Sequence, residues 1–361
     1  MTGDPCVRVA RERGEGTRRR LADAGLLDGD RQIEVEDGDI FLPVTDPAAA
    51  RALFVDGGDT GDIVSRATGH RDRQTMPADL LDEEPSYERL GDIVILEEDD
   101  PERARAVAAA VMESDVPCQT VVNRASKVRG EYRVREWDVL AGDGTETVHR
   151  EYGHEFRLDL STVYFSPRLA TERHRVVEQV TADERVFDMF AGVGPFAVPA
   201  ATRGAEVVAV DANPAAVAYL RENAARNGVA DRVTAIEGDV RGVVDGDRTG
   251  DDDGRTSDAD STVPSDRRDR RDSYHDWADR LVANLPHSAD EFLDTAVALA
   301  GDDCVLHYYD IQHEDDPFGP GARAIRAAAG ETYTVRVENE RVVRSYAPHE
   351  LNVCLDVRLR R

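Results

Sequence analysis

The sequence predicts an α/β protein: a Rossmann-like, doubly wound C-terminal domain preceded by two smaller α+β modules. Three observations support this prediction. Val186–Pro195 reads as an apolar strand, an acidic residue and a glycine turn that leads into a helix. A second apolar strand at 207–211 ends in Asp211, about 20 residues downstream, where nucleotide-binding folds place an acid. Strand and helix patterns then alternate, which indicates a mostly parallel sheet.

The N-terminal module is predicted over residues 1–57. The pair Asp37-Gly38 is favoured in two-residue hairpin turns and lies between two strand-like runs. Residues 58–84 are polar and rich in Gly and Asp, so they are expected to form a linker. The elements expected in the first module are a strand at 6–9, a helix at 17–26 and a hairpin at 32–44.

The middle module is predicted over residues 85–160 as a compact α+β unit. Its elements are a strand at 92–96, a helix at 101–114 with Pro101 in its first turn, and strands at 119–122, 130–140 and 149–160. Its basic residues have two interpretations: they form a solvated strand face, or they form a surface that contacts RNA phosphates. These residues are Arg124, Lys127, Arg129, Arg133 and Arg135.

The C-terminal domain is predicted over residues 161–361. A stretch at 241–272 interrupts its pattern with many Asp, Arg, Gly, Ser and Thr residues, and we expect a disordered surface insertion without a catalytic role. The expected helices are 166–180, 196 onward, 214–227, 288–300 and 321–329, and the expected strands are 186–188, 207–211, 233–236, 280–283, 304–309, 333–337 with 341–344, and 351–359.

The composition indicates an acidic protein from a halophilic source. Asp and Glu number 73 against 45 Lys and Arg, which gives a net charge of -28, and Lys127 is the only lysine. In salt of about 1 M the Debye length is only about 3 Å, so repulsion from a nucleic acid is largely screened. We see no apolar run of about 20 residues and no secretory signal, so we expect a cytoplasmic protein without a membrane partner.

The four cysteines carry no metal-site spacing. Cys6, Cys118, Cys304 and Cys354 are scattered without a CxxC pair, so neither a zinc site nor a disulfide framework is predicted. Buried free thiols are the expected state, and no metal ion is assigned.

The glycine turn favours a small zwitterionic nucleoside as ligand. Only Gly192-x-Gly194 is present, without the third glycine of dinucleotide sites and without a Gly-Lys-Ser/Thr phosphate loop. Asp188 suits an ammonium group, Asp211 the ribose hydroxyls and Asp239 an adenine amine, because all three follow strands. This set describes S-adenosylmethionine, with Phe190 and Ala191 in the same turn. Taken singly, each acid could instead cap a helix or turn.

The segment Asn284-Leu285-Pro286-His287 follows the fourth strand and therefore faces the same crevice. The Asn284 amide carries both a donor and an acceptor, which suits the edge of a base. The bland interpretation is a local turn residue.

Three motifs in this order resemble the archaeal and eukaryotic tRNA (guanine(37)-N1)-methyltransferase family: Val163–Arg173, Asp188–Phe196 and Asn284–His287. The resemblance covers nearly the whole chain. It implies a class I (Rossmann-like) methyltransferase domain with two N-terminal modules that contact tRNA. It also implies S-adenosylmethionine as cofactor, tRNA with G37 as substrate, and a monomeric enzyme.

The resemblance also implies residue roles. Glu172 would be the general base for the guanine N1 proton, although a carboxylate in a first helical turn is also favoured by the helix dipole. Asn284 and Arg133, with Arg135 as the alternative arginine, would stabilise charge at guanine O6. The substrate contacts would come from Tyr164 near the flipped base, from Pro286 beside Asn284, and from Arg168 and Arg173, which would order their motif or contact phosphate.

Two other functions stay open. A relative in wyosine synthesis would methylate a tricyclic base or transfer the aminocarboxypropyl group of the same cofactor; intact Glu172 and Asn284–His287 favour simple methylation. A non-catalytic RNA-binding protein on a methyltransferase scaffold is the alternative from another class.

Overall fold

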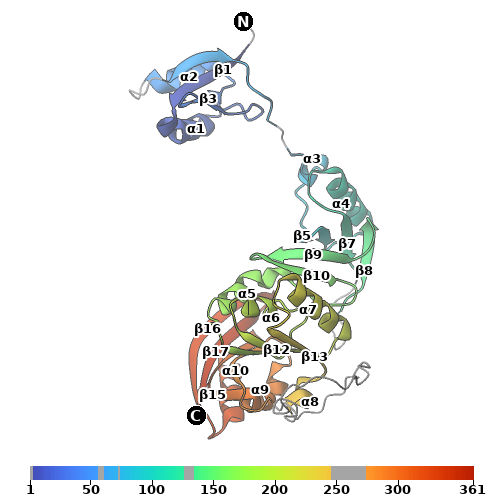
Figure 1. The fold of residues 1–361 in the computed structure, drawn as a ribbon. Helices are drawn as coiled ribbons and strands as arrows, with labels where there is room; N and C mark the ends of the chain where they lie inside the picture. Colours follow the sequence, from blue (N-terminus) through green and yellow to red (C-terminus); the bar gives the residue numbers. More distant parts are fainter. Residues whose placement is uncertain (1–2, 56–60, 72–73, 126–133, 245–273) are drawn as a thin grey trace, which may run out of the picture. The chain divides into compact units, whose positions relative to one another are not determined.

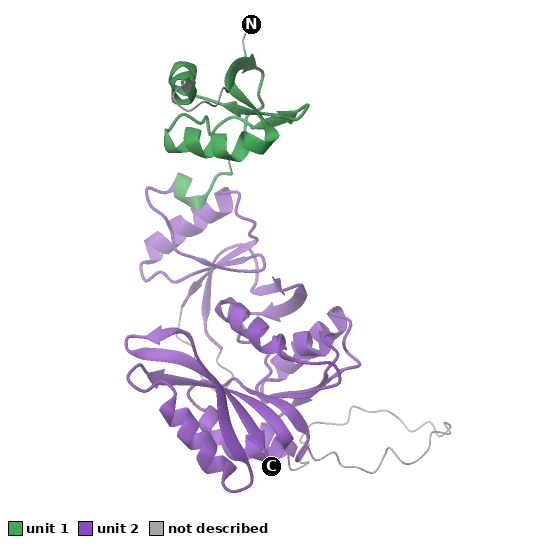
Figure 2. Ribbon diagram, turned by 90° about the vertical axis from the view of Figure 1, so that its left-hand side faces the viewer, with its two compact units in different colours: residues 1–79 green, residues 80–361 purple. Residues whose placement is uncertain are grey.

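The computed structural model describes residues 3–55, 61–71, 74–125, 134–244 and 274–361. The chain divides into two compact units, Met1–Asp79 and Leu80–Arg361 (Figure 2). Among the described residues, no helix is both long and apolar enough to cross a bilayer. All four cysteines are free, as expected from their spacing.

The first unit is a four-stranded sheet in the order β2-β3-β1-β4 with two helices. The hairpin forms as predicted, and Asp37 and Gly38 have φ angles of 51° and 86°. The predicted linker, residues 58–84, is wrong in part, because it contains strand β4. This strand pairs with the second edge of β1, whose first edge pairs with β3. The elements are β1 (Asp4–Ala10), α1 (Gly14–Asp23), β2 (Glu34–Glu36), β3 (Asp39–Pro43), α2 (Pro47–Val55) and β4 (Asp62–Arg66).

The second unit begins with a four-stranded sheet in the order β5-β6-β7-β8. Helix α4 covers one face through Val107 and Val111, and Asp100 caps it by accepting from the Glu102 amide at 2.9 Å. The other face packs into the core of the next domain, so the boundary expected at residue 160 does not separate two cores. Helix α3 (Pro77–Leu80) spans the division between the two units, and the elements that follow are β5 (Glu88–Leu90), β6 (Ile93–Leu96), α4 (Pro101–Glu113), β7 (Thr120–Arg124) and β8 (Trp137–Ala141).

A hairpin, β9 (Glu146–Glu151) with β10 (His154–Asp159), follows and is fixed to a helix of the C-terminal domain. The Arg157 amide donates to Asn223 Oδ1 at 2.8 Å, and Asn223 Nδ2 donates back to the Arg157 carbonyl at 3.1 Å. These bonds satisfy both backbone groups of a strand that would otherwise be an exposed edge.

The C-terminal domain is built on a seven-stranded sheet in the order β13-β12-β11-β14-β15-β17-β16. The strands β11 to β15 run parallel, and β17 and β16 close the sheet antiparallel. The two late strands predicted at 333–337 and 341–344 are one strand with register shifts. The strands are β11 (Arg185–Asp188), β12 (Glu206–Asp211), β13 (Val233–Glu237), β14 (Ala278–Ala283), β15 (Ala300–His313), β16 (Thr334–Ala347) and β17 (Glu350–Arg360).

Helices cover both faces of this sheet (Figure 1). Alternate residues of β12 divide between two cores: Val208 and Val210 face one, and Val207 and Ala209 face the other. Strand order reverses at β11, which lies between β12 and β14, and such a point opens a crevice at the carboxyl ends of the strands. One face carries α5 (Ala170–Val177), α6 (Ala197–Thr202) and α7 (Pro214–Arg226), and the other carries α8 (Val240–Val244), α9 (Leu293–Leu299) and α10 (Gly319–Ala329).

The expected insertion does not begin at residue 241. Residues 241–244 belong to α8, where Val243 and Val244 are buried in the core beside α9. Polar composition around these two valines concealed a short apolar helix. The remainder of the expected insertion, 245–272, lies outside the described residues.

Removing residues 241–272 is expected to lower the free energy of unfolding by about 2–4 kcal/mol, because the deletion takes Val243 and Val244 out of the core. Replacing only residues 246–272 by a short Gly/Ser linker keeps both valines and should leave stability unchanged. Denaturant unfolding in molar KCl compares the two variants. Equal unfolding midpoints would contradict the packing role of α8.

Candidate active site

A cavity of about 550 Å³ lies at the carboxyl ends of the parallel strands. Segments after β11, β12, β13 and β14 each contribute to its wall, as the strand order requires. Ten of the predicted site residues line it: Arg135, Tyr164, Arg173, Phe190, Ala191, Gly192, Asp211, Asp239, Asn284 and Pro286.

The two glycines of the turn have different roles. Gly192 has a φ of 54°, lines the cavity, and has open space where a Cβ would stand. Gly194 has a φ of 92°, but a Cβ there would lie 2.4 Å from Leu220 Cδ1, and Gly194 does not line the cavity. Gly194 therefore permits close packing of α7, whereas only Gly192 brings the backbone to a ligand.

Asp211 is held in place by the turn. The Gly192 amide donates to its Oδ2 at 2.7 Å, and the Asn213 amide donates to its Oδ1 at 2.8 Å. Burial raises the pKa of Asp211, and the two amide bonds oppose that shift. A carboxylate oriented in this way keeps lone pairs that can accept from both hydroxyls of a ribose.

Asp188 lies fully buried behind the turn and does not line the cavity. Within the described part of the chain, its Oδ2 has no hydrogen-bond partner. Burial raises the pKa of Asp188 to about 7, and the nearby Asp211 charge adds to the rise. The expected contact of Asp188 with an ammonium group stays a prediction. A cation close to this carboxylate would give its Oδ2 the partner that it lacks among the described residues.

The cavity wall beside Asp239 is aromatic and basic. Phe190 and Phe292 meet edge to face with centroids 4.9 Å apart, and Arg241 lies 4.6 Å over the Phe292 ring. Arg241 Nε donates to Asp239 Oδ1 at 2.9 Å. Arg241 thus holds the Asp239 carboxylate at the cavity wall, and its expected contact with an adenine amine stays a prediction.

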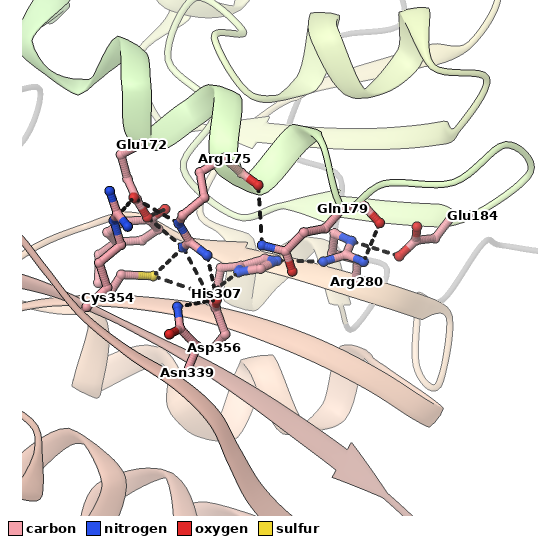
Figure 3. A network of polar contacts seen from close by, with 11 residues as sticks. Glu172, Arg175, Gln179, Glu184, Arg280, His307, Asn339, Cys354 and Asp356 are labelled. Atoms are coloured by element: carbon pink, nitrogen blue, oxygen red, sulfur yellow. Dashed lines mark hydrogen bonds and ion pairs between the residues drawn. The ribbon is translucent and has the colours of Figure 1, made fainter.

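Glu172 is 4% exposed, does not line the cavity, and is held by four donors (Figure 3). Its Oε1 accepts from Arg175 Nη2 at 2.7 Å and from the Tyr309 hydroxyl at 3.0 Å. Its Oε2 accepts from Arg175 Nε at 2.9 Å and forms an ion pair with Arg341 Nε at 2.9 Å. Three of these contacts are hydrogen bonds and the fourth, with Arg341, is an ion pair, so both carboxylate oxygens are engaged.

The same arginine continues into a buried chain of charges (Figure 3). Arg175 Nη1 donates to Asp356 Oδ2 at 2.6 Å, and His307 Nδ1 lies 2.6 Å from Asp356 Oδ1. Arg280 Nη1 lies 2.7 Å from His307 Nε2. Because arginine only donates, Nε2 is an acceptor and Nδ1 carries the proton. His307 is therefore neutral, in agreement with its pKa, which burial lowers.

His307, Cys354 and Asp356 place their ligand atoms within 4.8 Å of one another. This spacing would suit a metal ion, but both His307 nitrogens and the Asp356 carboxylate already bind neighbours. Arg175 and Arg280 lie against the cluster, so a dication would meet two positive charges. We assign the cluster to the polar network and not to a metal.

The arginines predicted to order the Val163–Arg173 motif or to contact the substrate have different surroundings. Arg173 is buried, donates through Nε to Glu151 Oε1 at 2.8 Å and through Nη2 to the Ser166 carbonyl at 3.1 Å, and thereby orders the Val163–Arg173 motif. Arg168 forms an ion pair with Glu88 and lies outside the cavity wall. Arg133 falls outside the described residues.

Sequence reasoning missed one whole wall of the cavity. Arg344, Tyr346 and Asn352 line it from β16 and β17, together with Ile311. His287 has a φ of 83° and meets the Tyr346 ring at 5.1 Å. An asparagine inside the apolar run of β17 was the available signal.

Three family models match the chain. The TRM5/TYW2 methyltransferase domain matches residues 147–253 and 255–338, the tRNA methyltransferase 5 N-terminal domain matches 6–52, and the TYW2 N-terminal domain matches 73–145. These matches follow the three-part order of the chain.

Individual relatives agree with the family models. The tRNA (guanine(37)-N(1))-methyltransferase Trm5b of Pyrococcus abyssi is 36% identical over 98% of both chains, and a crystal structure of Trm5b from that organism covers 99% of this chain with a TM-score of 0.68. A complex of aTrm5 with tRNALeu has a TM-score of 0.67 at 28% identity and covers 98% of this chain and 99% of that one. A tRNA(Phe) (4-demethylwyosine(37)-C(7)) aminocarboxypropyltransferase of Pyrococcus horikoshii is 30% identical over 79% of this chain and 93% of its own.

Affinity for S-adenosylmethionine is expected to rise about tenfold from pH 6 to pH 8, because the pKa of Asp188 lies at about 7 and only its ionised form attracts a cation. Calorimetry at a series of pH values measures the dissociation constant. Asp188→Asn should bind weakly and without this pH dependence. Equal slopes in both proteins would show that another group titrates.

Proposed function

This chain belongs to the TRM5/TYW2 methyltransferase family, whose members use S-adenosylmethionine, and from that premise we propose that it methylates N1 of guanosine 37 in tRNA. The supporting observation is the match to Trm5b over 98% of both chains, which includes the N-terminal domain. The cavity adds a cofactor crevice that adjoins Asn284, a residue able to bind a base edge.

The cavity residues fit the cofactor. S-adenosylmethionine supplies an electrophilic methyl group on a sulfonium. Asp211, oriented by two backbone amides, accepts from the ribose hydroxyls, and Gly192 leaves room for the ligand beside the turn. Asp239 and the Phe190–Phe292 pair form the adenine end of the cavity.

Glu172 removes the N1 proton in this proposal. Guanine N1 becomes a nucleophile as its proton passes to the carboxylate, its lone pair forms the new N–C bond, and the sulfonium S–C bond breaks with its electrons left on sulfur. One of the four donors to Glu172 must leave first. Arg341 is the candidate, because its side chain is 44% exposed against 19% for Arg175.

Negative charge that develops on guanine O6 needs donors. Asn284 and Arg135 line the same cavity, and burial with the nearby Arg124 charge lowers the pKa of Arg135. Donors that are oriented before the reaction stabilise such charge without reorganisation. Arg133, the arginine first expected in this role, lies outside the described residues, so Arg135 takes its place in the proposal. Tyr164, which is exposed at the cavity, offers a ring on which the flipped base can stack.

Transfer of an aminocarboxypropyl group is the second candidate, since a relative named for that reaction is 30% identical. That relative accounts for 79% of this chain, whereas the matches to Trm5b extend over 98%. We therefore place methyl transfer first. We further propose that the enzyme is adapted to concentrated salt, on the ground of its net charge of -28 and its single lysine, and that it acts as a monomer.

Labelled methyl transfer to tRNA transcripts tests the function. In molar KCl the protein should methylate a transcript with G37 and leave an A37 transcript unmodified, because adenine carries an amine where guanine O6 would accept from Asn284 and Arg135. Nucleoside mass spectrometry should identify 1-methylguanosine. An aminocarboxypropyl product, or methylation at another position, would exclude the proposal.

Glu172→Gln should lower the single-turnover rate by about 100-fold or more, the usual contribution of a general base. Cofactor affinity should change little, because Glu172 does not line the cavity. Glu184→Gln is the matched control: Glu184 pairs with Arg280 at 2.7 Å in the same network, far along the chain of charges from Glu172.

Equal losses of rate in the two variants, in step with equal losses of stability, would make Glu172 a structural residue. A rate loss in Glu172→Gln that far exceeds the loss in Glu184→Gln, at comparable losses of stability, is the result that the proposal expects.

A further inference from the structure

Two residues of the cavity wall carry buried polar atoms without partners among the described residues. Asn352 is 4% exposed, and within the described ranges neither its Oδ1 nor Nε of Arg344 has a hydrogen-bond partner. Both residues line the cavity, and they are opposite each other in the pairing of β17 with β16. Buried polar groups are nearly always bonded, so an orphaned acceptor beside an orphaned donor indicates a ligand that supplies both complements.

The place of this pair in the sheet shows which end of the cavity it serves. Asp211 and Asp239 follow β12 and β13 at one end, and Asn284 follows β14 beyond the reversal at β11. Asn352 of β17 pairs with Ile311 of β15 and with Arg344 of β16. These three residues therefore continue the cavity wall across the sheet, away from the cofactor end. Asn352 and Arg344 thus bound the acceptor end of the cavity.

Arg344 also belongs to a cationic pocket. A second cavity of about 140 Å³ shares Arg344 with the first and is lined by Arg124, Arg135 and Arg168 as well. Glu88 also lines it and pairs with Arg124 and Arg168, so Arg135 and Arg344 are the arginines of this wall that form no ion pair with a described carboxylate. Burial, together with the nearby Arg344 charge, lowers the pKa of Arg168. Such a concentration of arginine in a chain with a net charge of -28 favours an anion at this wall.

We propose that Asn352 and Arg344 recognise the ribose and phosphate of the target nucleotide, so that Asn352 Oδ1 accepts from the 2′-hydroxyl and Arg344 binds the adjacent 3′-phosphate. This inference rests on the proposed function. Guanine N1 must face the methyl donor, and the ribose is attached at the opposite side of the base, so the sugar meets the far wall. The 2′-hydroxyl is a donor and the 3′-phosphate an acceptor on neighbouring carbons, which matches side chains about 5 Å apart across two strands.

The pair would give the enzyme a way to require RNA at the methylated position, because the 2′-hydroxyl is the group that DNA lacks. The rival donor on guanosine is the 2-amino group of the base. Inosine lacks that amine but keeps the ribose, so it separates the two possibilities.

The test uses full-length protein and tRNAs that carry guanosine, 2′-deoxyguanosine or inosine at position 37. The wild-type kcat/KM should fall about tenfold for deoxyguanosine, the effect of one lost bond to a buried acceptor. Asn352→Ala should lose about tenfold on guanosine and show no further loss on deoxyguanosine. Asn352→Asp, which keeps an acceptor, should still discriminate.

Asn339→Ala is the matched control. Asn339 lies on the same hairpin and donates to Asp356 at 3.1 Å, away from the cavity wall, so its variant should keep the wild-type ratio of guanosine to deoxyguanosine. If Asn352→Ala does not fold, Asn352→Leu, which is closer in volume, replaces it.

A ratio that Asn352→Ala leaves unchanged would overturn the inference, and so would a loss of discrimination against inosine instead of deoxyguanosine. A wild-type protein that methylates no G37 transcript would overturn the proposed function, whereas active wild-type protein with an unchanged ratio overturns this inference alone.

Discussion

The catalytic domain depends on two buried carboxylates, Glu172 and Asp356, that share Arg175 as a partner, while Arg341 supplies the second positive charge. Arg175 binds Glu172 on its own helix and Asp356 on β17, and it therefore ties α5 to the far side of the sheet. A buried charge that loses its partner is strongly destabilising, so neither carboxylate tolerates a displaced helix. Because α5 continues the Val163–Arg173 motif, this ion pair also fixes Tyr164 and the wall of the cavity.

Paired residues of β15 and β17 lead in three successive rows from the buried charge network to the cavity. His307 and Asp356 are paired deepest, Tyr309 and Cys354 follow two residues later, and Ile311 and Asn352 reach the cavity. Successive rows lie about 7 Å apart along the strands. Glu172 binds at the middle row through Tyr309, one row below the cavity, so the proposed base must exchange one of its contacts to reach a substrate.

Local signals predicted the elements that position the cofactor. The glycine turn, the strands around it and the acids Asp211 and Asp239 follow from periodicity and turn chemistry, which act over a few residues. The prediction failed for features that depend on contacts between residues far apart in the sequence. Gly194 is needed because a side chain there would collide with Leu220. Strand β4 forms because it pairs with the free edge of β1. Arg344 and Asn352 meet in the cavity wall because of the register between β16 and β17, which no local pattern encodes.

The central claim is that Glu172 exchanges a structural contact for the guanine N1 proton. A solved complex with tRNA and S-adenosylhomocysteine measures this directly. The account predicts a Glu172 oxygen within hydrogen-bond distance of guanine N1, with Arg341 turned away and Arg175 still in place. A complex in which all four donors remain on Glu172 and N1 lies against another residue would contradict it.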